Sequence, residues 1–335
     1  PAARKEVKPR PHVWSRSANG RWQEWPDNFP SWSYDYGDVA VADFDKDGRP
    51  DIAYAAHAHG VAVLLNRGEA KWELMTSLFQ AVGEFSSRAL DAADIDGDGW
   101  VDLVALAEAF TATPGPTGVR ILYNQQGKTW RREEIKAAEH VFGDHVAVGD
   151  LDGRGRPAII LGSLINGYRD IVWVREGDGW RPLPEGIPDR LLFWDAALCD
   201  AGKRGKQDLF LLVDSTRKDN VFGPRVFRRE NSSWIDVSAG LPQIVSRAFA
   251  VGDLDGSGGC TLAVGHLHEG SLQLFRLAPS QQWQQWLVLA RAEEIRGVPY
   301  GVEVADLDAD GLADLVVNYA EDPGLGGIQV WLARR

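Results

Sequence analysis

The stretch Asp43-Phe44-Asp45-Lys46-Asp47-Gly48-Arg49-Pro50-Asp51 places aspartates at positions 1, 3, 5 and 9 of a short loop. Carboxylates this close together repel one another unless a cation lies between them. A hard dication suits the loop, because Ca²⁺ takes six to eight oxygen ligands. Glycine at position 6 permits the sharp turn that brings the carboxylates together. The stretch therefore predicts a calcium-binding loop.

The same loop recurs along the whole chain. Its first position falls at residues 43, 94, 150, 200, 253 and 306, at steps of 50 to 56 residues. In each repeat an alternating apolar run such as VAVADFD precedes the loop, and a second run such as DIAYAA follows it. A third run and a tryptophan-marked fourth run complete the unit. The tryptophans are Trp72, Trp130, Trp180, Trp234 and Trp283. Four short strands in each of six units are typical of β-propeller blades.

The sequence thus predicts an all-β fold: a single β-propeller of six four-stranded blades over residues 12–335, after a flexible segment at residues 1–11. The sixth unit reaches only its third strand by Arg335. Residues 19–25 (NGRWQEW) look like the start of a fourth strand, so we expect an N-terminal strand to complete the last blade and close the ring. Residues 12–17 (HVWSRS) could form one more third strand, which leaves seven blades as the alternative.

The loops differ in how complete they are. Loops one, two and six carry every predicted ligand, with the position 7 carbonyl added to the carboxylates, and we expect one calcium ion in each. Their predicted ligands are Asp43, Asp45, Asp47, Arg49 and Asp51; Asp94, Asp96, Asp98, Trp100 and Asp102; and Asp306, Asp308, Asp310, Leu312 and Asp314. Loop five keeps Asp253, Asp255 and Ser257, which makes a weaker fourth site possible. Loops three and four carry Arg154 and Arg204 among their ligand positions, and we expect them to be metal-free.

The repeats resemble FG-GAP/VCBS repeats, which build the integrin-α-like β-propellers. The DxDxDGxxD loops carry this resemblance, together with an aromatic–glycine step before strand one at Tyr36-Gly37, Phe142-Gly143 and Tyr300-Gly301. The sequence lacks the Gly-Ala-Pro step of the family signature, which places it nearer to the bacterial VCBS group. The resemblance implies bound calcium and a ligand on the face opposite the calcium loops. Propellers of this kind occur in adhesion proteins, lectins and polysaccharide-degrading enzymes.

The loops of that opposite face vary from blade to blade, as a single asymmetric site on a repeated scaffold requires. No residue among them is assigned a catalytic role. The predicted ligand-binding residues are His57, Arg88, His145, Trp194, Asp195, Arg247, His266 and Tyr300. Trp25 and Trp32 do not recur at a blade position, so they are further candidates for stacking on a ligand.

The favoured function is a ligand-binding module for a glycan or a protein. One alternative is an enzyme acting on polysaccharides. A lyase would use His145 or Tyr300 as base and an arginine to neutralise the substrate carboxylate, whereas a hydrolase would pair Glu108 with Asp144, Asp195 or Asp214. The other alternative is a purely structural propeller.

Composition limits the partners and the compartment. The net charge of −12 argues against nucleic acid as a binding partner. The sequence contains no run of 18 apolar residues, so we expect no insertion into a membrane. Because the chain starts at Pro1 and calcium is abundant outside the cytosol, we expect a secreted, periplasmic or cell-surface protein whose signal peptide has been removed. Cys199 and Cys260 lie in different repeats, which favours two buried thiols over a disulfide. The oligomeric state is left open, with a monomer as the default.

Overall fold

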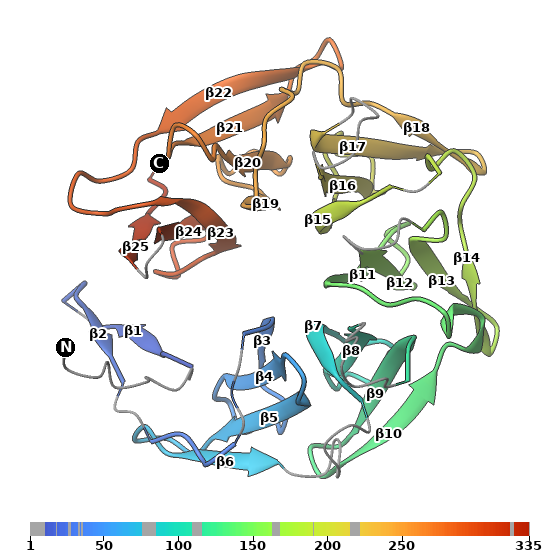
Figure 1. Ribbon diagram of the computed structural model, residues 1–335, viewed down its shortest axis with the longest axis vertical. Helices are drawn as coiled ribbons and strands as arrows, with labels where there is room; N and C mark the ends of the chain where they lie inside the picture. The colour runs from blue at the N-terminus through green and yellow to red at the C-terminus, as the bar shows by residue number, and fades with distance from the viewer. Residues whose placement is uncertain are drawn as a thin grey trace, which may run out of the picture. The chain divides into compact units, whose positions relative to one another are not determined.

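The computed structural model describes residues 11–17, 19–25, 28–32, 34, 36–75, 85–108, 116–162, 168–189, 191–214, 222–321 and 325–334. Within these ranges the regular structure is β-strand, apart from one short 3₁₀ turn, η1 (Lys136–Ala138). The strands form a six-bladed β-propeller with antiparallel blades, as the repeats predicted (Figure 1). The flexible segment predicted at 1–11 lies, but for residue 11, outside the described residues.

The chain divides into two compact units, Pro1–Val146 and Ala147–Arg335. The first unit holds a two-stranded sheet, β1-β2, and two four-stranded blades, β3-β4-β5-β6 and β7-β8-β9-β10. Its strands are β1 (Trp14–Arg16), β2 (Trp22–Glu24), β3 (Val39–Ala42), β4 (Asp51–Ala56), β5 (Gly60–Asn66), β6 (Trp72–Met75), β7 (Ser87–Ala93), β8 (Asp102–Ala107), β9 (Val119–Gln125) and β10 (Thr129–Glu134).

The second unit holds three four-stranded blades and one of three strands; the first strand of its first blade begins two residues before the division. These strands are β11 (His145–Asp150), β12 (Pro157–Gly162), β13 (Val172–Glu176), β14 (Gly179–Pro182), β15 (Phe193–Cys199), β16 (Asp208–Val213), β17 (Gly223–Glu230), β18 (Ser233–Asp236), β19 (Phe249–Gly252), β20 (Thr261–Gly265), β21 (Leu272–Leu277), β22 (Trp283–Leu289), β23 (Val298–Ala305), β24 (Asp314–Glu321) and β25 (Leu325–Trp331).

The second strand of each blade explains why the loops are held so firmly. In β4, β8 and β16 all six residues are buried, and each strand opens with the position 9 aspartate of its loop. The remaining residues of these strands are apolar, so they pack on both faces between neighbouring sheets. In these three blades the aspartate-rich loop is therefore anchored to a fully buried strand.

Three of the five recurring tryptophans contact the preceding blade, as predicted, whereas Trp72 stacks on Phe29. Trp130 donates its indole N–H to the Met75 sulfur of the preceding blade at 3.0 Å. Trp234 donates to the Leu183 carbonyl at 3.0 Å, and Trp283 donates to the Val237 carbonyl at 3.1 Å. A large apolar ring with one polar atom suits this position, since burial and a hydrogen bond are satisfied together.

The N-terminal strand pairs differently from the prediction. β2 pairs with β1, and the last blade contains β23, β24 and β25 as its described strands. Between the two short strands, Gly20, at φ +80°, donates its N–H to the Ser17 carbonyl at 2.8 Å. The prediction relied on the likeness of residues 19–25 to other fourth strands. The alternative interpretation, in which residues 12–17 form a further strand beside residues 19–25, agrees with the observed β1–β2 pairing. That pairing needs a far shorter loop closure than pairing with the last blade.

The segment after this hairpin packs on the first blade. Trp72 lies 5.9 Å from Trp25 and stacks on Phe29 at 5.3 Å between ring centroids. Trp32 packs edge-on against Tyr54 at 5.8 Å. Trp25 and Trp32 are therefore part of an aromatic packing cluster, which favours a packing role for them over a ligand platform.

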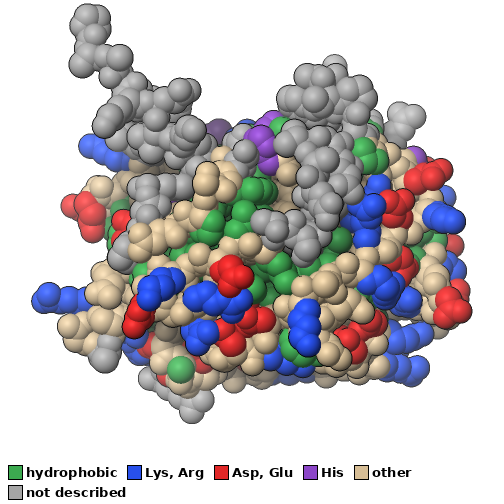
Figure 2. Space-filling model, turned by 90° about the horizontal axis from the view of Figure 1, so that it is seen from below, with side chains coloured by type: hydrophobic (Ala, Val, Ile, Leu, Met, Phe, Trp, Pro, Cys, Tyr) green, Lys and Arg blue, Asp and Glu red, His purple; other side chains and the backbone are tan. Residues whose placement is uncertain are grey.

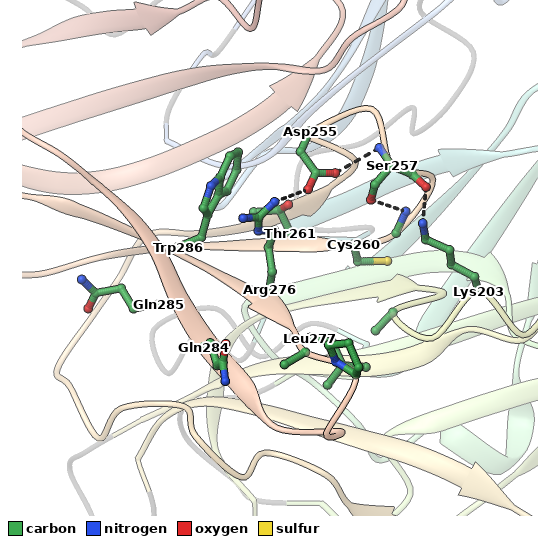
Figure 3. A pocket seen from close by; sticks show the side chains of 14 residues that line it. Lys203, Asp255, Ser257, Cys260, Thr261, Arg276, Leu277, Gln284, Gln285 and Trp286 are labelled. Atoms are coloured by element: carbon green, nitrogen blue, oxygen red, sulfur yellow. Dashed lines mark hydrogen bonds and ion pairs between the residues drawn. The ribbon is translucent and has the colours of Figure 1, made fainter. Parts of the chain in front are cut away.

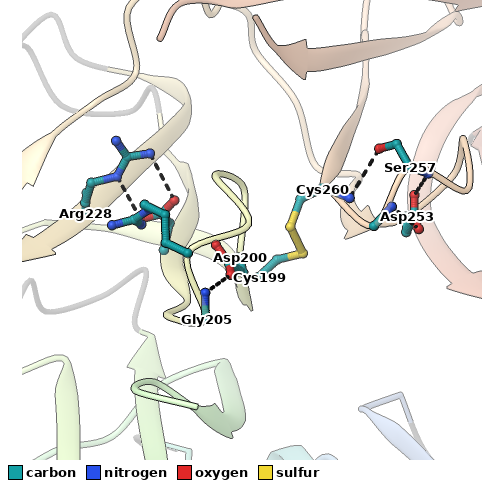
Figure 4. The surroundings of a disulfide bond; sticks show 11 residues. Cys199, Asp200, Gly205, Arg228, Asp253, Ser257 and Cys260 are labelled. Atoms are coloured by element: carbon teal, nitrogen blue, oxygen red, sulfur yellow. Dashed lines mark hydrogen bonds and ion pairs between the residues drawn. A yellow bond between two sulfur atoms is a disulfide. The ribbon is translucent and has the colours of Figure 1, made fainter. Parts of the chain in front are cut away.

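Cys199 and Cys260 form a disulfide, which corrects the expectation of two free thiols. Their Cα atoms lie 6.2 Å apart, within the range that a disulfide spans. Cys199 ends β15 directly before loop four, and Cys260 directly precedes β20 at the end of loop five (Figure 4). The bridge thus joins the loop corners of two successive blades, a proximity that sequence spacing does not reveal.

Candidate calcium and ligand sites

All six loops share one turn that depends on no metal. The position 1 aspartate accepts the N–H of the position 6 glycine, at 2.9 Å for Asp43 and Gly48 and at 2.6 Å for Asp150 and Gly155. Equivalent bonds occur in the other four loops. The position 6 glycines have φ between +70° and +84°, where a side chain would be strained. The turn alone is therefore not evidence for a metal site.

Three of the loops differ from the others in bringing carboxylates together. Among the described residues, the groups of three acidic side chains whose ligand atoms lie within 4.8 Å of one another combine positions 1, 3 and 9. They are Asp43, Asp45 and Asp51; Asp94, Asp96 and Asp102; and Asp306, Asp308 and Asp314. These are loops one, two and six, the three that are complete in sequence.

The position 9 aspartate of each cluster is fixed by the backbone. In loop two, Asp102 accepts the N–H of Ile95 at 2.9 Å and that of Asn124 at 2.8 Å, one on each carboxylate oxygen. Asp51 and Asp314 repeat this arrangement. The carboxylate therefore connects its loop to the end of the third strand and is held in place before any metal arrives.

The electrostatics of the clusters suit a dication. Burial raises the pKa of Asp102 to about 6, and the charges of Asp96 and Asp98 add to the rise against two backbone hydrogen bonds. Burial likewise raises the pKa of Asp51. In loop one, Asp45 Oδ1 is buried and accepts no hydrogen bond. An oxygen donor set with unbalanced negative charge fits calcium, whose ligands are carboxylate and carbonyl oxygens.

The position 5 aspartates lie outside these three clusters. Asp47, Asp98 and Asp310 each accept the N–H of position 7, at 3.0, 2.8 and 2.9 Å respectively. The second carboxylate oxygen of Asp47 pairs with Arg49, and that of Asp310 lies 3.7 Å from Arg334. Their ligation, and that of the position 7 carbonyls, stays a prediction.

Arginines partly balance two of the clusters. Arg67 pairs with Asp45 in loop one, and Arg334 pairs with Asp308 in loop six at 2.7 Å. In loop two, the described residues place Lys46 over the Trp100 ring, 4.1 Å from its centroid, and no basic side chain in an ion pair with the cluster. Loop two is thus the least compensated of the three sites.

Loop five contains its own cation. Arg276 pairs with Asp255 at 2.7 Å, beside the Trp286 ring, in a pocket of about 440 Å³ (Figure 3). Burial would raise the pKa of Asp255, but the hydrogen bonds from Ser257 and Arg276 lower it to about 2. With Thr261 at position 9, the loop offers two carboxylates where the complete loops offer three clustered ones.

Loops three and four also place guanidinium groups beside their aspartates. In loop four, Arg204 and Arg228 both pair with the buried Asp208. In loop three it is Arg156, not Arg154, that pairs with Asp152. The chain itself therefore supplies a positive charge for Asp208 and for Asp152.

At the opposite end of the blades, the first unit gathers four side chains around Arg88. Arg88 pairs with Asp144, donates to the Tyr36 hydroxyl at 3.0 Å and lies 3.8 Å from Glu108. The Tyr36 ring stacks on His57 at 4.6 Å. Burial would lower the pKa of Arg88, but the hydrogen bond and charge of Asp144 outweigh it and raise the pKa. We call these residues the Arg88 cluster.

Glu108 organises the Arg88 cluster from beneath. Its side chain is 3% exposed, and it contacts His57 Nδ1 at 2.7 Å while accepting the Ala58 N–H at 2.6 Å and the Ser86 hydroxyl. A carboxylate with this many donors positions its neighbours. This engagement leaves Glu108 poorly suited to act as the acid of a hydrolase, which must reach a substrate oxygen.

The second unit holds a comparable group around Arg247. Its guanidinium lies over the Trp194 ring at 4.8 Å and the Tyr300 ring at 5.5 Å, and it donates to the Tyr300 hydroxyl at 3.4 Å. The Trp194 indole donates to Asp214 at 3.0 Å. Tyr300 is 46% exposed. In the described part of the chain no carboxylate forms an ion pair with Arg247. We call these residues the Arg247 platform.

The two arginines occupy the same place in their blades. Arg88 lies in Ser87-Arg88-Ala89 and Arg247 in Ser246-Arg247-Ala248, and in each the serine hydroxyl donates to the alanine carbonyl. A serine that bonds its own backbone two residues on bulges the chain and turns the intervening side chain outward. The repeated Ser-Arg-Ala tripeptide is a sequence signal that the prediction did not use.

The remaining predicted ligand-binding residues, Asp195, His266 and His145, are not among the contacts described for the Arg88 cluster and the Arg247 platform. Asp195 accepts the N–H of Ala196 at 2.7 Å at the start of β15. His266 accepts the N–H groups of His268 and Glu269 at 3.3 and 3.1 Å, so it caps a turn. His145 opens β11, next to Asp144 of the Arg88 cluster. Figure 2 shows basic and acidic side chains intermingled on one face of the molecule, so charge of one sign does not mark a site there.

Comparison with known proteins supports the same class. A family model described as an FG-GAP-like repeat matches residues 43–105. The chain is 33% identical to integrin alpha-6 of Gallus gallus over 122 residues, 34% of this chain and 11% of that protein. It is 28% identical to integrin alpha-PS2 of Drosophila melanogaster over 167 residues, 43% of this chain and 12% of that protein. The matches thus span about a tenth of each relative's length.

A solved structure described as the Dos1 propeller shares the fold. It aligns with a TM-score of 0.55 at 10% identity, over 97% of this chain and 76% of that one. Fold and loops together define a six-bladed β-propeller with aspartate-rich corners. The matches confirm the predicted resemblance of its repeats to the FG-GAP, integrin-α-like family.

Proposed function

We propose that the protein is an exported, calcium-stabilised β-propeller that binds a ligand through the loops opposite its calcium corners. The observation that carries the ligand site is the Arg247 platform, an exposed guanidinium held between two aromatic rings without a carboxylate partner among the described residues. Such a group recognises an acidic substituent on a glycan or a protein, because it adds charge-assisted hydrogen bonds to a stacking surface.

Calcium is assigned to loops one, two and six. In each, three carboxylates converge on one point, and the buried position 9 aspartate is already fixed by backbone N–H groups. Loop five is a weaker fourth candidate, since Arg276 competes for Asp255. The ions would hold the corner between strands one and two of their blades, which links metal binding to folding.

Replacing Asp96 by alanine tests the calcium assignment at loop two. Asp96→Ala removes one of three clustered carboxylates, so we expect the number of calcium ions bound, measured by native mass spectrometry, to fall by one. Asp152→Ala is the matched control, since Asp152 occupies the same loop position but already pairs with Arg156. An unchanged calcium count in Asp96→Ala would contradict the assignment.

Binding to immobilised glycans and candidate proteins tests the ligand face. Arg247→Ala should weaken binding to acidic ligands by about tenfold or more, as expected for loss of a charge-assisted contact worth at least 1.5 kcal/mol. Lys128→Ala is the control, because Lys128 is an exposed basic residue in the β9–β10 turn at the calcium end of its blade. Equal losses in the two variants would argue against a site at Arg247.

The enzymatic alternative has its own test. Release of unsaturated uronates, followed by near-ultraviolet absorbance, would establish a lyase, and its loss in His145→Ala but not in His12→Ala would place the base. In the described residues the contacts of Glu108 favour binding over paired-carboxylate hydrolysis.

Export is supported by the disulfide, since such bonds persist in oxidising compartments. No helix in the described ranges has the length and apolar character needed to cross a membrane. We further propose that residues 12–335 act as one propeller domain and that the protein works as a monomer.

A further inference from the structure

A basic pocket of about 380 Å³ lies in the second unit between loops three and four. Six cationic side chains line it: Arg154, Arg156, Arg181, Arg204, Lys206 and Arg229. Asp152 is the one acidic residue of the lining. This concentration of positive charge is unexpected in a protein of net charge −12.

The pocket lies beside loops three and four, whose ligand positions carry positive charge where the complete loops carry negative charge. Arg154 and Arg204 stand at loop position 5, where the complete loops carry an aspartate, and Arg156 and Lys206 stand at position 7. The turn itself is kept, because Asp150 and Asp200 still accept the N–H of their position 6 glycines. The same backbone therefore presents guanidinium and ammonium groups in place of carboxylates.

Half of these cations lack a counterion. Arg156 pairs with Asp152, Arg204 with Asp208, and Arg181 with Glu176 at 2.8 Å. Across the described ranges, no carboxylate forms an ion pair with Arg154, Lys206 or Arg229. The first two are exposed at the loop tips.

Arg229 lines the pocket with a partly buried side chain. Its Nη1 atom is buried and has no hydrogen-bond acceptor, while its guanidinium lies 5.7 Å from the centre of the Trp234 ring. Burial lowers the pKa of Arg229, and the nearby charge of Arg181 lowers it further against the opposing effect of Glu185. The Arg229 guanidinium therefore adds positive charge beside the pocket without an ion pair among the described residues.

The walls of the pocket are rigid. Gln207 donates its backbone N–H to the Leu151 carbonyl at 3.1 Å, which connects loop four to loop three. Gly153 lies so close to the Gly205 carbonyl that a Cβ would approach that oxygen to 2.4 Å. The basic side chains of the two loops are thus held at a common site before a ligand binds.

We propose that this pocket binds a sulfate or phosphate ester group of a larger molecule. Guanidinium groups match tetrahedral oxyanions with paired N–H donors, and an ammonium group adds a point charge. The volume falls at the lower end of the roughly 300–1,000 Å³ of ligand pockets, which leaves room for part of the molecule that carries the ester. The site is separate from the Arg247 platform in chemistry and lies at the opposite, calcium-loop end of its blades.

Titration with dextran sulfate, dextran phosphate and uncharged dextran at physiological ionic strength tests the proposal. We expect at least one of the two anionic polymers to bind and dextran not to bind, and the tighter polymer identifies the ester. Arg154→Gln/Lys206→Gln should weaken that binding at least tenfold, because two unpaired cations are lost. The matched control Lys128→Gln/Lys136→Gln removes the same charge from two exposed lysines outside the pocket and should change binding less than twofold.

Two results would overturn the proposal: neither anionic polymer binds, or the control variant loses as much affinity as the pocket variant. A melting curve verifies that each variant is folded. Should the double variant be unstable, the single substitution Arg154→Gln replaces it, because this side chain is exposed and has no ion-pair partner among the described residues. We expect Arg154→Gln to weaken binding severalfold. Unchanged binding would likewise overturn the proposal.

Discussion

Removing calcium with excess EGTA should lower the melting temperature of this protein by about 10 °C. A site that binds only the folded state contributes about 2.7 kcal/mol when free calcium is 100 times Kd. The summed contribution of three such sites, divided by an unfolding entropy of about 2.1 cal/mol/K per residue, gives a shift in melting temperature of this size. Without the ions, three carboxylates within 4.8 Å of one another repel in each complete loop.

The effect should be unequal along the chain. Loops one and two lie in Pro1–Val146 and only loop six lies in Ala147–Arg335, so limited proteolysis in EGTA should cut the first unit earlier. EGTA with calcium restored in excess is the control for ionic strength. A melting curve that EGTA leaves unchanged would contradict structural calcium.

Breaking the disulfide should destabilise the second unit. Cys199 and Cys260 are 61 residues apart, and a cross-link of that length restricts the unfolded chain by about 4 kcal/mol on a chain-entropy model. We expect Cys199→Ser/Cys260→Ser to lower the melting temperature by about 6 °C in saturating calcium. Differential scanning calorimetry measures the shift.

Thiol labelling provides the independent check of the bridge. Iodoacetamide should modify no cysteine in the urea-unfolded protein until a reductant is added, and two afterwards. The double variant treated with reductant is the control and should melt as it does without reductant. Two reactive thiols before reduction would show that the bridge is absent.

The expected effects of calcium removal and of breaking the disulfide concern different loops between the first and second strands of the blades. Blades with loops one, two and six bring together the carboxylates for a dication, whereas loops four and five carry Arg204, Arg228 and Arg276 as internal cations. The disulfide joins those same two loops, and Lys203 donates to the Ser257 carbonyl across them. The contacts that join two loops therefore occur where the set of clustered carboxylates is incomplete. Internal ion pairs occur in complete loops as well, at Arg67 and Arg334.

Much of the fold followed from local pattern. The run DIAYAA was expected as a second strand and is β4, fully buried. The tryptophans were expected between blades because they recur at one position, and Trp130, Trp234 and Trp283 lie there. Periodicity succeeds in such cases because each repeat has to bury the same faces against its neighbours.

Contacts between distant residues could not be predicted in this way. Arg88 and Arg247 share a tripeptide and a backbone position, yet Asp144 neutralises the first, whereas the second stands over Trp194 without a carboxylate partner among the described residues. The difference comes from the side chains that neighbouring blades present. No spacing within a single repeat contains that information.

By itself, the sequence determined the six repeats, their strands and the three loops that cluster carboxylates, since the stretch at residues 43–51 and its copies specify turn and burial locally. The tertiary structure decided which residues meet across blades: the pairing of Cys199 with Cys260, the Arg88 cluster, the Arg247 platform and the basic pocket. The physical reason is that a turn is set by bonds within a few residues. A site, in contrast, needs charges from separate repeats to be brought within hydrogen-bond distance by the packing of the sheets.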